Sequence, residues 1–315
     1  MIKKSLLILV GIALFVFILL KVNLTQTWAL LRTADWRLCV AAFMTLLAMV
    51  YLKGMRWSFL LKMQGHSYST WNCFLIYMGS LFWGNVTPGR AGDFMKVLYL
   101  KEDLGIPIGL GMTSVVVDRV FDLYLLLILG SLGVLIYPLG LPPSLVHLVW
   151  IFFAFLIFAS FLVFNRRIGE VLIKAVFQRV LGASLKEKAN QAFGEFHRGM
   201  EAFYSWRLVV PALLSLTSYL LFFMGSFWMA QSIGLSINFF FLAFTLSVVN
   251  IVSLLTFLGM GTREGALIVL FGCIGLTQAQ ALAYSLLIFF VGTVLFTLVC
   301  LLCFFLKPIR FKDHF

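Results

Sequence analysis

The chain has 315 residues, of which 62% are hydrophobic and 11% are charged, and its formal net charge is +12. A mean hydropathy of +1.05 is too apolar for a soluble domain, and recurring apolar runs of about 20 residues are typical of membrane-spanning helices. The basic residues cluster beside these runs, which favours the anionic membrane surface or an anionic lipid as partner rather than nucleic acid. We therefore expect an all-α polytopic membrane protein with a single integral membrane domain over residues 1–315.

In chain order, the apolar segments predict about eight transmembrane helices. Lys3 and Lys4 precede the first segment and no small-residue cleavage site follows it, so we expect an uncleaved span rather than a signal peptide. The predicted spans are residues 5–20, 37–52, 71–86, 107–137, 145–164, 207–230, 239–258 and 279–306. A basic loop is expected after the second span, containing Lys53, Arg56 and Lys62.

Two polar regions are expected to lie on the membrane surface. Residues 23–36 read as a short amphipathic helix at an interface, and residues 166–206 as amphipathic helices on the cytoplasmic side. Placing both termini in the cytoplasm puts most Lys and Arg residues of the short loops on that side, as the positive-inside rule requires. The sequence therefore predicts a multi-pass protein of the cell (cytoplasmic) membrane with both termini in the cytoplasm.

Two charged, glycine-rich stretches interrupt the apolar sequence. The first is WGNVTPGRAGDFMKVLYLK at 83–101, and its helix-breaking and charged residues are Pro88, Gly89, Arg90, Gly92, Asp93 and Lys96. The second is LGMGTREG at 258–265, and its corresponding residues are Gly259, Gly261, Arg263, Glu264 and Gly265. Charge is costly in hydrocarbon and tends to mark a site, and a broken helix exposes backbone groups that can line a cavity. We expect broken or re-entrant helices at Pro88–Leu104 and Gly259–Ile274.

The two stretches occupy corresponding places in two halves of the chain, about residues 1–137 and 145–306. The span before the first stretch is expected to run outward and the span before the second inward, so the halves would form two inverted repeats. Inverted repeats with helices broken at matching positions point to a transporter site near the membrane midplane. A chance match between two glycine-rich breaks is the alternative.

The arginines of the two stretches are candidate headgroup ligands. Arg90 and Arg263 are each followed by a carboxylate, Asp93 or Glu264. One interpretation is a pair of internal salt bridges that hold the two helix breaks in place. The other is binding of a phosphate by the planar guanidinium groups and by the N-termini of the short helices, with the carboxylates orienting the arginines. Lys96 is a further candidate ligand for the phosphate.

A third charged group lies within the predicted span 107–137. Asp118 and Asp122 are four residues apart and share one helical face, with Arg119 beside them. They could bind a cation, carry a proton or pair internally, and Arg119 is a candidate headgroup ligand. Phe289 stands where the repeat places the counterpart of Arg119.

No constellation typical of catalysis is visible in the sequence. The four histidines are isolated from one another, and no metal-ligand spacing, phosphate-binding glycine loop or nucleophile elbow is found. The five cysteines lie in apolar segments and are expected to be packing residues. We therefore expect no metal and no cofactor, and we assign no catalytic residue, which leaves enzyme activity open but unsupported.

At these residues the chain resembles the transmembrane region of lysylphosphatidylglycerol synthases and related flippase-like membrane proteins. The matching motifs are PGRAGD at 88–93 with the following Lys96, VVVDRVFD at 115–122 and GMGTREGAL at 259–267. Asp93 and Asp118 stand where that family tends to have Glu, and Phe289 stands where a basic residue is common. The aminoacyl-transferase domain of the synthases is not found in these residues, so the resemblance implies lipid handling rather than lipid synthesis.

Our functional hypothesis is a flippase- or scramblase-like transporter. It would move an anionic, aminoacylated or otherwise polar-headgroup lipid, or a lipid-linked precursor, between leaflets. The alternatives are a membrane-embedded enzyme and an accessory scaffold of lipid or cell-envelope glycan biosynthesis. The expected partners are membrane lipids, with a second copy of the chain or a lipid-biosynthesis enzyme as further options.

Overall fold

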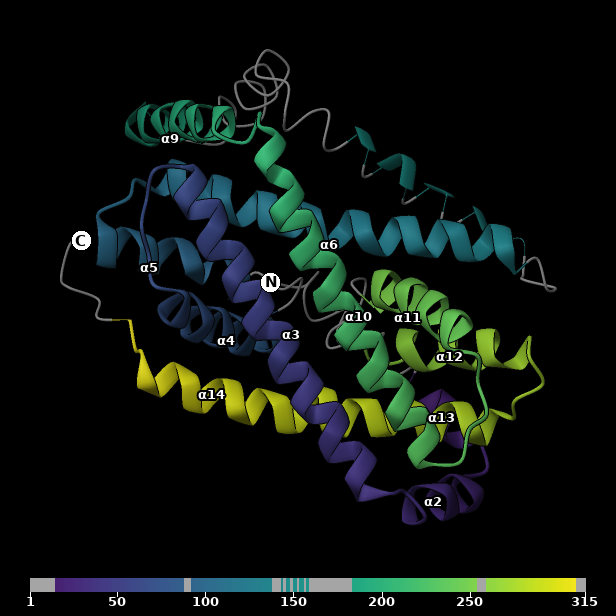
Figure 1. The fold of residues 1–315 in the computed structure, drawn as a ribbon. Helices are drawn as coiled ribbons and strands as arrows, with labels where there is room; N and C mark the ends of the chain where they lie inside the picture. The colour runs from purple at the N-terminus through teal and green to yellow at the C-terminus, as the bar shows by residue number, and fades with distance from the viewer. Residues whose placement is uncertain are drawn as a thin grey trace.

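The computed structural model describes residues 15–87, 92–137, 183–253 and 259–309, with single residues and short runs between 143 and 158. This described part of the chain is helical throughout (Figure 1). The first half contributes α2 Leu24–Arg32, α3 Trp36–Met63, α4 Thr70–Val86, α5 Met95–Leu104 and α6 Ile108–Ile136. The second half contributes α9 Ala183–Glu201, a 3-10 turn at Trp206–Leu208, α10 Val209–Ser232, α11 Phe239–Ser253, α12 Thr262–Gly272, α13 Gln278–Ile288, a π-helix at Phe289–Leu295 and α14 Phe296–Leu306.

Several of these helices are long and apolar enough to cross a membrane. Four qualify alone, namely Trp36–Met63, Ile108–Ile136, Trp206–Ser232 and Gln278–Leu306. A fifth would combine Phe15–Lys21 with Leu24–Arg32, which meet at 94°. The molecule is therefore a multi-pass membrane protein. Most of the predicted spans 5–20 and 145–164 lies outside the described residues. The helices at the predicted spans 71–86 and 239–258, Thr70–Val86 and Phe239–Ser253, have 17 and 15 residues and are not among these candidate spans. The expected total of about eight therefore remains a prediction.

The predicted basic loop after the second span is wrong. Helix α3 continues for 28 residues to Met63 and carries both Lys53 and Arg56 within it. No proline interrupts this segment, and both cations find carboxylate partners on α6, which offsets the cost of placing charge among apolar helices. The chain turns only at Gly65, whose φ of 84° is readily adopted by glycine.

The short helices expected after the two charged stretches are both present, as α5 and α12. Helix α5 ends at Gly105 in the left-handed conformation, and α12 begins after Gly261 with φ of 77°. The second break therefore has a backbone conformation that glycine adopts more readily than other residues. Residues 88–91, which include Pro88, Gly89 and Arg90, and residues 254–258 lie outside the described residues.

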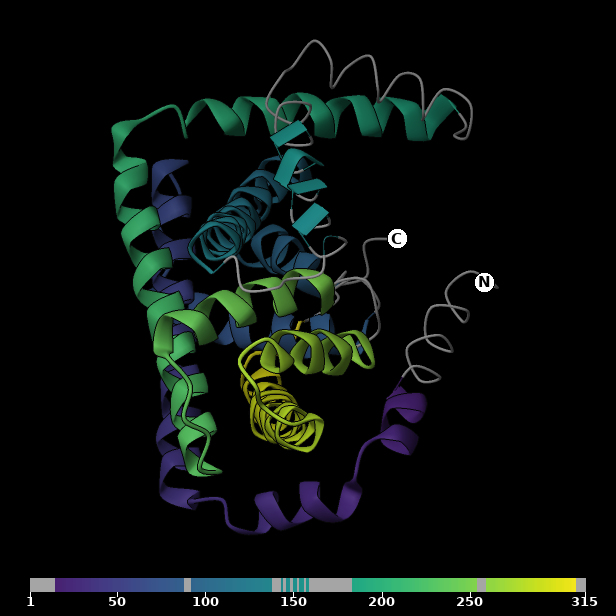
Figure 2. The same ribbon diagram turned by 90° about the vertical axis from the view of Figure 1, so that its right-hand side faces the viewer.

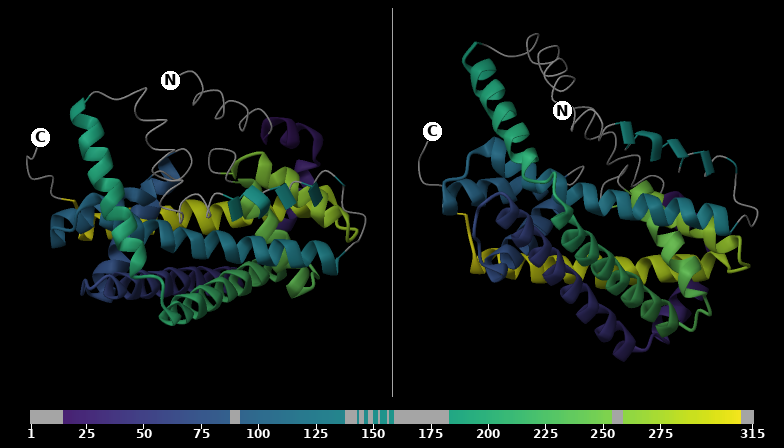
Figure 3. Two further views of the ribbon diagram at one scale, coloured as in Figure 1. Left: turned by 90° about the horizontal axis from the view of Figure 1, so that it is seen from above. Right: turned by 45° about the horizontal axis from the view of Figure 1, so that its top comes forward.

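Helices α3 and α10 pack along each other in opposite directions and form one face of the molecule (Figures 1 and 3). Helices α6 and α13–α14 cross behind them along similar lines (Figure 3). Helix α4 packs on α14 and α11 packs on α6. The amphipathic helices α2 and α9 lie across opposite ends of the α3–α10 pair (Figure 2).

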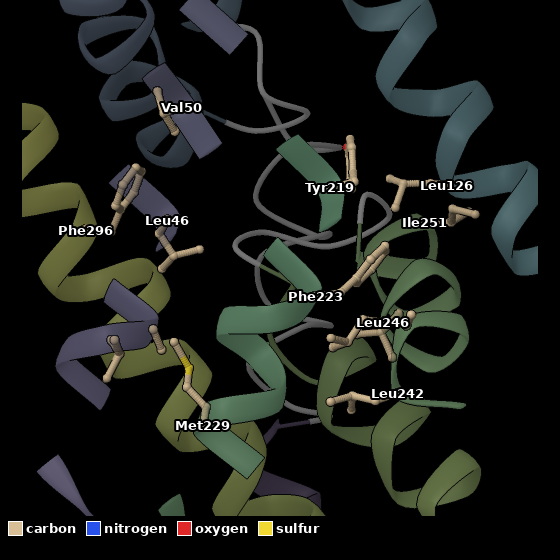
Figure 4. Close-up of a cluster of buried hydrophobic side chains, with 14 of the residues drawn as sticks. Leu46, Val50, Leu126, Tyr219, Phe223, Met229, Leu242, Leu246, Ile251 and Phe296 are labelled. Carbon is tan, nitrogen blue, oxygen red and sulfur yellow. The ribbon is translucent and has the colours of Figure 1, made fainter. Parts of the chain in front are cut away.

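The apolar core joins the two halves. Figure 4 shows side chains from α3, α6, α10, α11 and α14 meeting in one cluster, which includes Leu46, Leu126, Phe223, Leu246 and Phe296. Where small residues occur at the helix contacts, the backbones approach closely, as is common between membrane helices. The crossing of α6 and α11 depends on such a residue, because a Cβ added at Gly133 would lie 1.9 Å from Phe244 Cδ2.

We expect Gly133→Ala to destabilise the fold by about 1–3 kcal/mol, since the added methyl group overlaps the Phe244 ring and the helices must separate. Gly130→Ala is the matched control: it lies one turn earlier in α6, and its added Cβ would have only ordinary contacts, the nearest at 3.7 Å. Thermal unfolding in detergent should show a lower Tm for Gly133→Ala alone. Equal Tm values for the two variants would contradict the close crossing.

Candidate functional site

Arg56 lies at the centre of a buried ionic network among α3, α4, α5, α6 and α10. Its guanidinium bridges two carboxylates of α6, with Nη2 2.7 Å from Asp118 Oδ1 and Nη1 2.8 Å from Asp122 Oδ1. Nη1 also donates to Ser215 Oγ on α10 at 2.8 Å. The side chains of Arg56 and Asp118 are fully buried. The planar guanidinium suits this task because its donors are arranged to match two acceptors at once.

Lys96 of α5 completes the coordination of Asp118. Its Nζ lies 3.0 Å from Asp118 Oδ2 and 3.3 Å from the centroid of the Tyr77 ring. Tyr77 also donates its hydroxyl to Asp118 Oδ2 at 3.0 Å. Asp118 therefore accepts from Arg56, Lys96 and Tyr77 together, which is the degree of compensation that a buried carboxylate needs.

Arg119 and Lys53 lie at the edge of the same network. Arg119 Nη2 lies 2.8 Å from Asp93 Oδ2, and Lys53 Nζ lies 3.1 Å from Asp122 Oδ2. The Arg119 side chain keeps 21% of its surface exposed, in contrast to Arg56 and Lys96. Among the described residues, its Nε has no hydrogen-bond partner. Arg119 is thus paired with Asp93 and yet partly exposed, with a buried Nε that has no hydrogen-bond partner in the described part of the chain.

The network carries an excess of positive charge. In the described part of the chain it contains four cations, Lys53, Arg56, Lys96 and Arg119, and three carboxylates, Asp93, Asp118 and Asp122. The difference is one positive charge in a region from which water is largely excluded. An unbalanced charge in such a place is costly unless an anion joins it.

A second, smaller ionic centre lies at the start of α12. Arg263 Nη2 lies 2.5 Å from Glu264 Oε1, and the same carboxylate accepts from Ser285 Oγ at 2.9 Å and from the backbone N–H of Gly261 at 2.7 Å. Glu264 thereby satisfies an N-terminal amide of α12 and holds Arg263. The guanidinium also lies over the Phe289 ring, 4.9 Å from its centroid, which is a cation–π geometry.

The two centres face one cavity of about 240 Å³. Its charged lining residues are Lys53 and Arg119 from the first half and Arg263 from the second. Neutral polar and apolar side chains make up the rest of the walls, and they include Asn85, Thr87, Ser226, Asn250, Ser253, Leu46, Met49, Leu81, Phe222, Leu246, Ile288 and Phe296. The arrangement combines a few fixed cations with apolar walls, which is the usual character of a ligand site.

The structure brings some of the predicted site residues to this cavity and places others behind it. Arg119, Arg263 and Gly259 line it. Lys96, Asp118, Asp122, Asp93 and Glu264 are buried and are not among its lining residues. Gly92 approaches Trp83 so closely that an added Cβ would lie 2.1 Å from its carbonyl carbon, and Gly265 lies within α12. Arg90 lies outside the described residues.

Sequence reasoning missed Arg56 and Lys53 as members of the site. The signal was present, because Lys53, Arg56 and Trp57 share a helical face in a segment without proline. Among the described residues, no group of three or more His, Cys, Asp or Glu side chains is placed to hold a metal ion. The carboxylates of the network are instead engaged by cations.

We expect Asp118→Asn to lower the free energy of unfolding by about 3–5 kcal/mol, because Arg56 and Lys96 would remain buried without their shared countercharge. Asp35→Asn is the control, since Asp35 is exposed and caps α3, a position where Asn is equally favourable. Chemical unfolding in mild detergent measures both variants. A difference below about 1 kcal/mol between them would show that the network is not a structural centre.

Comparisons with known proteins identify the family of this chain. Residues 5–300 match the family described as "Lysylphosphatidylglycerol synthase TM region". A UPF0104 membrane protein of Methanocaldococcus jannaschii is 26% identical over 306 residues, covering 90% of this chain and 89% of the relative. Another, from Methanothermobacter thermautotrophicus, is 25% identical over 284 residues, covering 83% of this chain and 82% of the relative. The chain belongs to the family of the lysylphosphatidylglycerol synthase transmembrane region.

Proposed function

We propose that this protein is a flippase- or scramblase-like transporter that passes a phosphate-bearing lipid headgroup between the leaflets. The observation that carries the proposal is the shared cavity, in which cations from both halves, Arg119 and Arg263, face the same buried space. The family assignment supports a role in lipid handling. A phosphate would neutralise the excess positive charge of the network on entering the cavity.

The two arginines are suited to different parts of this task. Arg263 is fixed by Glu264, by Ser285 Oγ at 2.9 Å from its Nε, and by the Phe289 ring, so it presents a rigid donor. Arg119 has one carboxylate contact at 2.8 Å and a second, longer one at 3.7 Å. In this proposal Arg119 and Arg263 bind the phosphate in turn as the headgroup crosses, and the carboxylates keep both guanidinium groups in place between transfers. Arg90 remains a candidate on sequence grounds.

The size and polarity of the cavity favour a headgroup over a whole lipid. A volume of about 240 Å³ is below the range of about 300–1,000 Å³ that is usual for drug-sized ligands. It accommodates a phosphate with a small substituent, whereas acyl chains do not fit. The chains would therefore remain in the surrounding lipid while the headgroup moves through the helix bundle, as the apolar outer surfaces of the spanning helices allow.

The reciprocal packing of the helices supports the two inverted repeats. Helix α4 precedes the first short helix and packs on α14 at the end of the second half. Its counterpart α11 precedes the second short helix and packs on α6 at the end of the first half. The corresponding helices α3 and α10 pack on each other. A pseudo-two-fold arrangement of this kind would let one half rock against the other around the cavity.

We expect Arg119→Lys and Arg263→Lys each to reduce lipid transfer about ten- to a hundredfold in proteoliposomes. Lysine keeps the charge but loses the two-pronged donor set, and a lost charge-assisted hydrogen bond is worth about 1.5–3 kcal/mol. Arg198→Lys is the matched control, because Arg198 is exposed on α9 and lies outside the cavity. The rate of transfer of acyl-labelled lipids to the outer leaflet is measured at equal protein incorporation and with equal Tm.

The outcomes of this experiment distinguish a transporter from the two alternatives, a scaffold and a membrane enzyme. Transfer at the wild-type rate in both cavity variants, or a loss confined to Arg198→Lys, would contradict the proposed site. A scaffold for another enzyme would transfer no lipid and would tolerate both substitutions in cells. A membrane enzyme would change the mass of the lipid during incubation, which mass spectrometry of the extracted lipids detects.

A further inference from the structure

We infer that the cavity selects lipids whose headgroup carries the phosphate as its only charge, and that it disfavours headgroups that also carry an ammonium group. The inference rests on the proposed function and narrows its substrate class. It follows from how the charges are layered around the cavity: cations at the surface of the cavity and carboxylates behind them.

The described lining of the cavity carries charge of one sign. Lys53, Arg119 and Arg263 line it, and no Asp or Glu stands among the described lining residues. A phosphodiester monoanion meets complementary charge here at short range. An ammonium group on the same headgroup would meet three like charges in a space of about 240 Å³, where Coulomb energies are much larger than in water.

The nearby carboxylates are buried, and each of them pairs with at least one cation. Asp118 accepts from Arg56, Lys96 and Tyr77, and Glu264 accepts from Arg263, Ser285 and the Gly261 amide. Asp122 pairs with Lys53 and Arg56. Asp93 pairs with Arg119 through Oδ2, whereas its Oδ1 is buried and has no hydrogen-bond partner within the described residues. Apart from the unpartnered Oδ1 of Asp93, which is buried and does not line the cavity, an ammonium group could gain a carboxylate oxygen only by displacing one of these cations. Displacement would leave a buried cation unpaired at considerable cost.

Neutral polar side chains face the rest of the headgroup. Asn85 donates its side-chain N–H to Thr297 Oγ1, and Asn250 donates to the carbonyl of Leu246, each at 2.8 Å. Each side-chain amide also carries an acceptor oxygen, and Ser253 Oγ has no hydrogen-bond partner within the described residues. These groups suit an uncharged, hydroxyl-bearing substituent, because a hydroxyl can both donate and accept.

The test compares three acyl-labelled lipids in proteoliposomes: phosphatidylglycerol, phosphatidylethanolamine and lysyl-phosphatidylglycerol. We expect transfer of phosphatidylglycerol to be at least about tenfold faster than that of either ammonium-bearing lipid. Equal rates, or faster transfer of either ammonium-bearing lipid, would overturn the inference. Competition between the same lipids for the detergent-solubilised protein, read by native mass spectrometry, gives the selectivity of binding independently of transfer.

The transfer assay and the binding assay together distinguish the proposed transport from the proposed headgroup selectivity. Preferential binding of phosphatidylglycerol without transfer of any lipid would refute the proposed transport and uphold the selectivity of the cavity. Transfer of all three lipids with equal binding would uphold transport and refute the selectivity. Equal binding without transfer would refute both.

A charge-introducing variant tests the physical cause directly. Asn250→Asp adds a carboxylate to the cavity lining, so we expect it to reduce the preference for phosphatidylglycerol over lysyl-phosphatidylglycerol by about tenfold. Asn238→Asp makes the same change at the exposed N-terminus of α11, where the side chain caps the helix and Asp serves equally well. It should leave the preference unchanged. An unchanged preference in Asn250→Asp, with protein stability retained, would overturn the inference.

Discussion

The bridge from Arg56 to Asp118 and Asp122 is the interaction on which the site depends. It ties α3 to α6 over one helical turn, and the bond to Ser215 adds α10. Arg119 follows Asp118 directly, so it is rotated by about 100° around the α6 axis from its neighbour. Because both carboxylates are held toward α3, the Arg119 side chain is directed elsewhere, and it reaches the cavity. The orientation of a candidate ligand is therefore set by a pair of residues that do not line the cavity.

The two ionic centres share a carboxylate–arginine pair, but the additional contacts that support the pair differ between them. In each, a carboxylate stands behind an arginine that lines the cavity: Asp93 behind Arg119, and Glu264 behind Arg263. In the first centre the additional support is ionic, from a cluster of buried charges. In the second it comes from Ser285, from a helix N-terminus and from the Phe289 ring. An aromatic face stabilises a cation without a second charge, so the second half needs no counterpart of the larger network.

The sequence predicted the breaks, the short helices and most of the charged residues, because glycine, proline and intramembrane charge are local signals. It offered the Arg263–Glu264 pair as one alternative, but it could not predict the partners that are distant in sequence. Asp93 pairs with Arg119, from which it is separated by a whole helix, and Asp118 pairs with Arg56 from an earlier span. The hydropathy pattern ended the second span near Lys53, although α3 runs on to Met63. A charge lowers hydropathy whether or not it is neutralised, and neutralisation depends on helices that are distant in sequence.

The buried network also imposes an order on biogenesis. Arg56 precedes Asp118 by 62 residues, so α3 emerges from the ribosome with two cations well before their carboxylates are made. Inserting an unpaired Lys or Arg at the centre of a helix costs about 2.5–3.5 kcal/mol on the insertion scale. Helix α3 is apolar enough to cross a membrane by itself, but the cost of its two cations is offset only once Asp118 and Asp122 of α6 have been made. The buried cations of α3 thus couple the stability of one membrane helix to the synthesis of another.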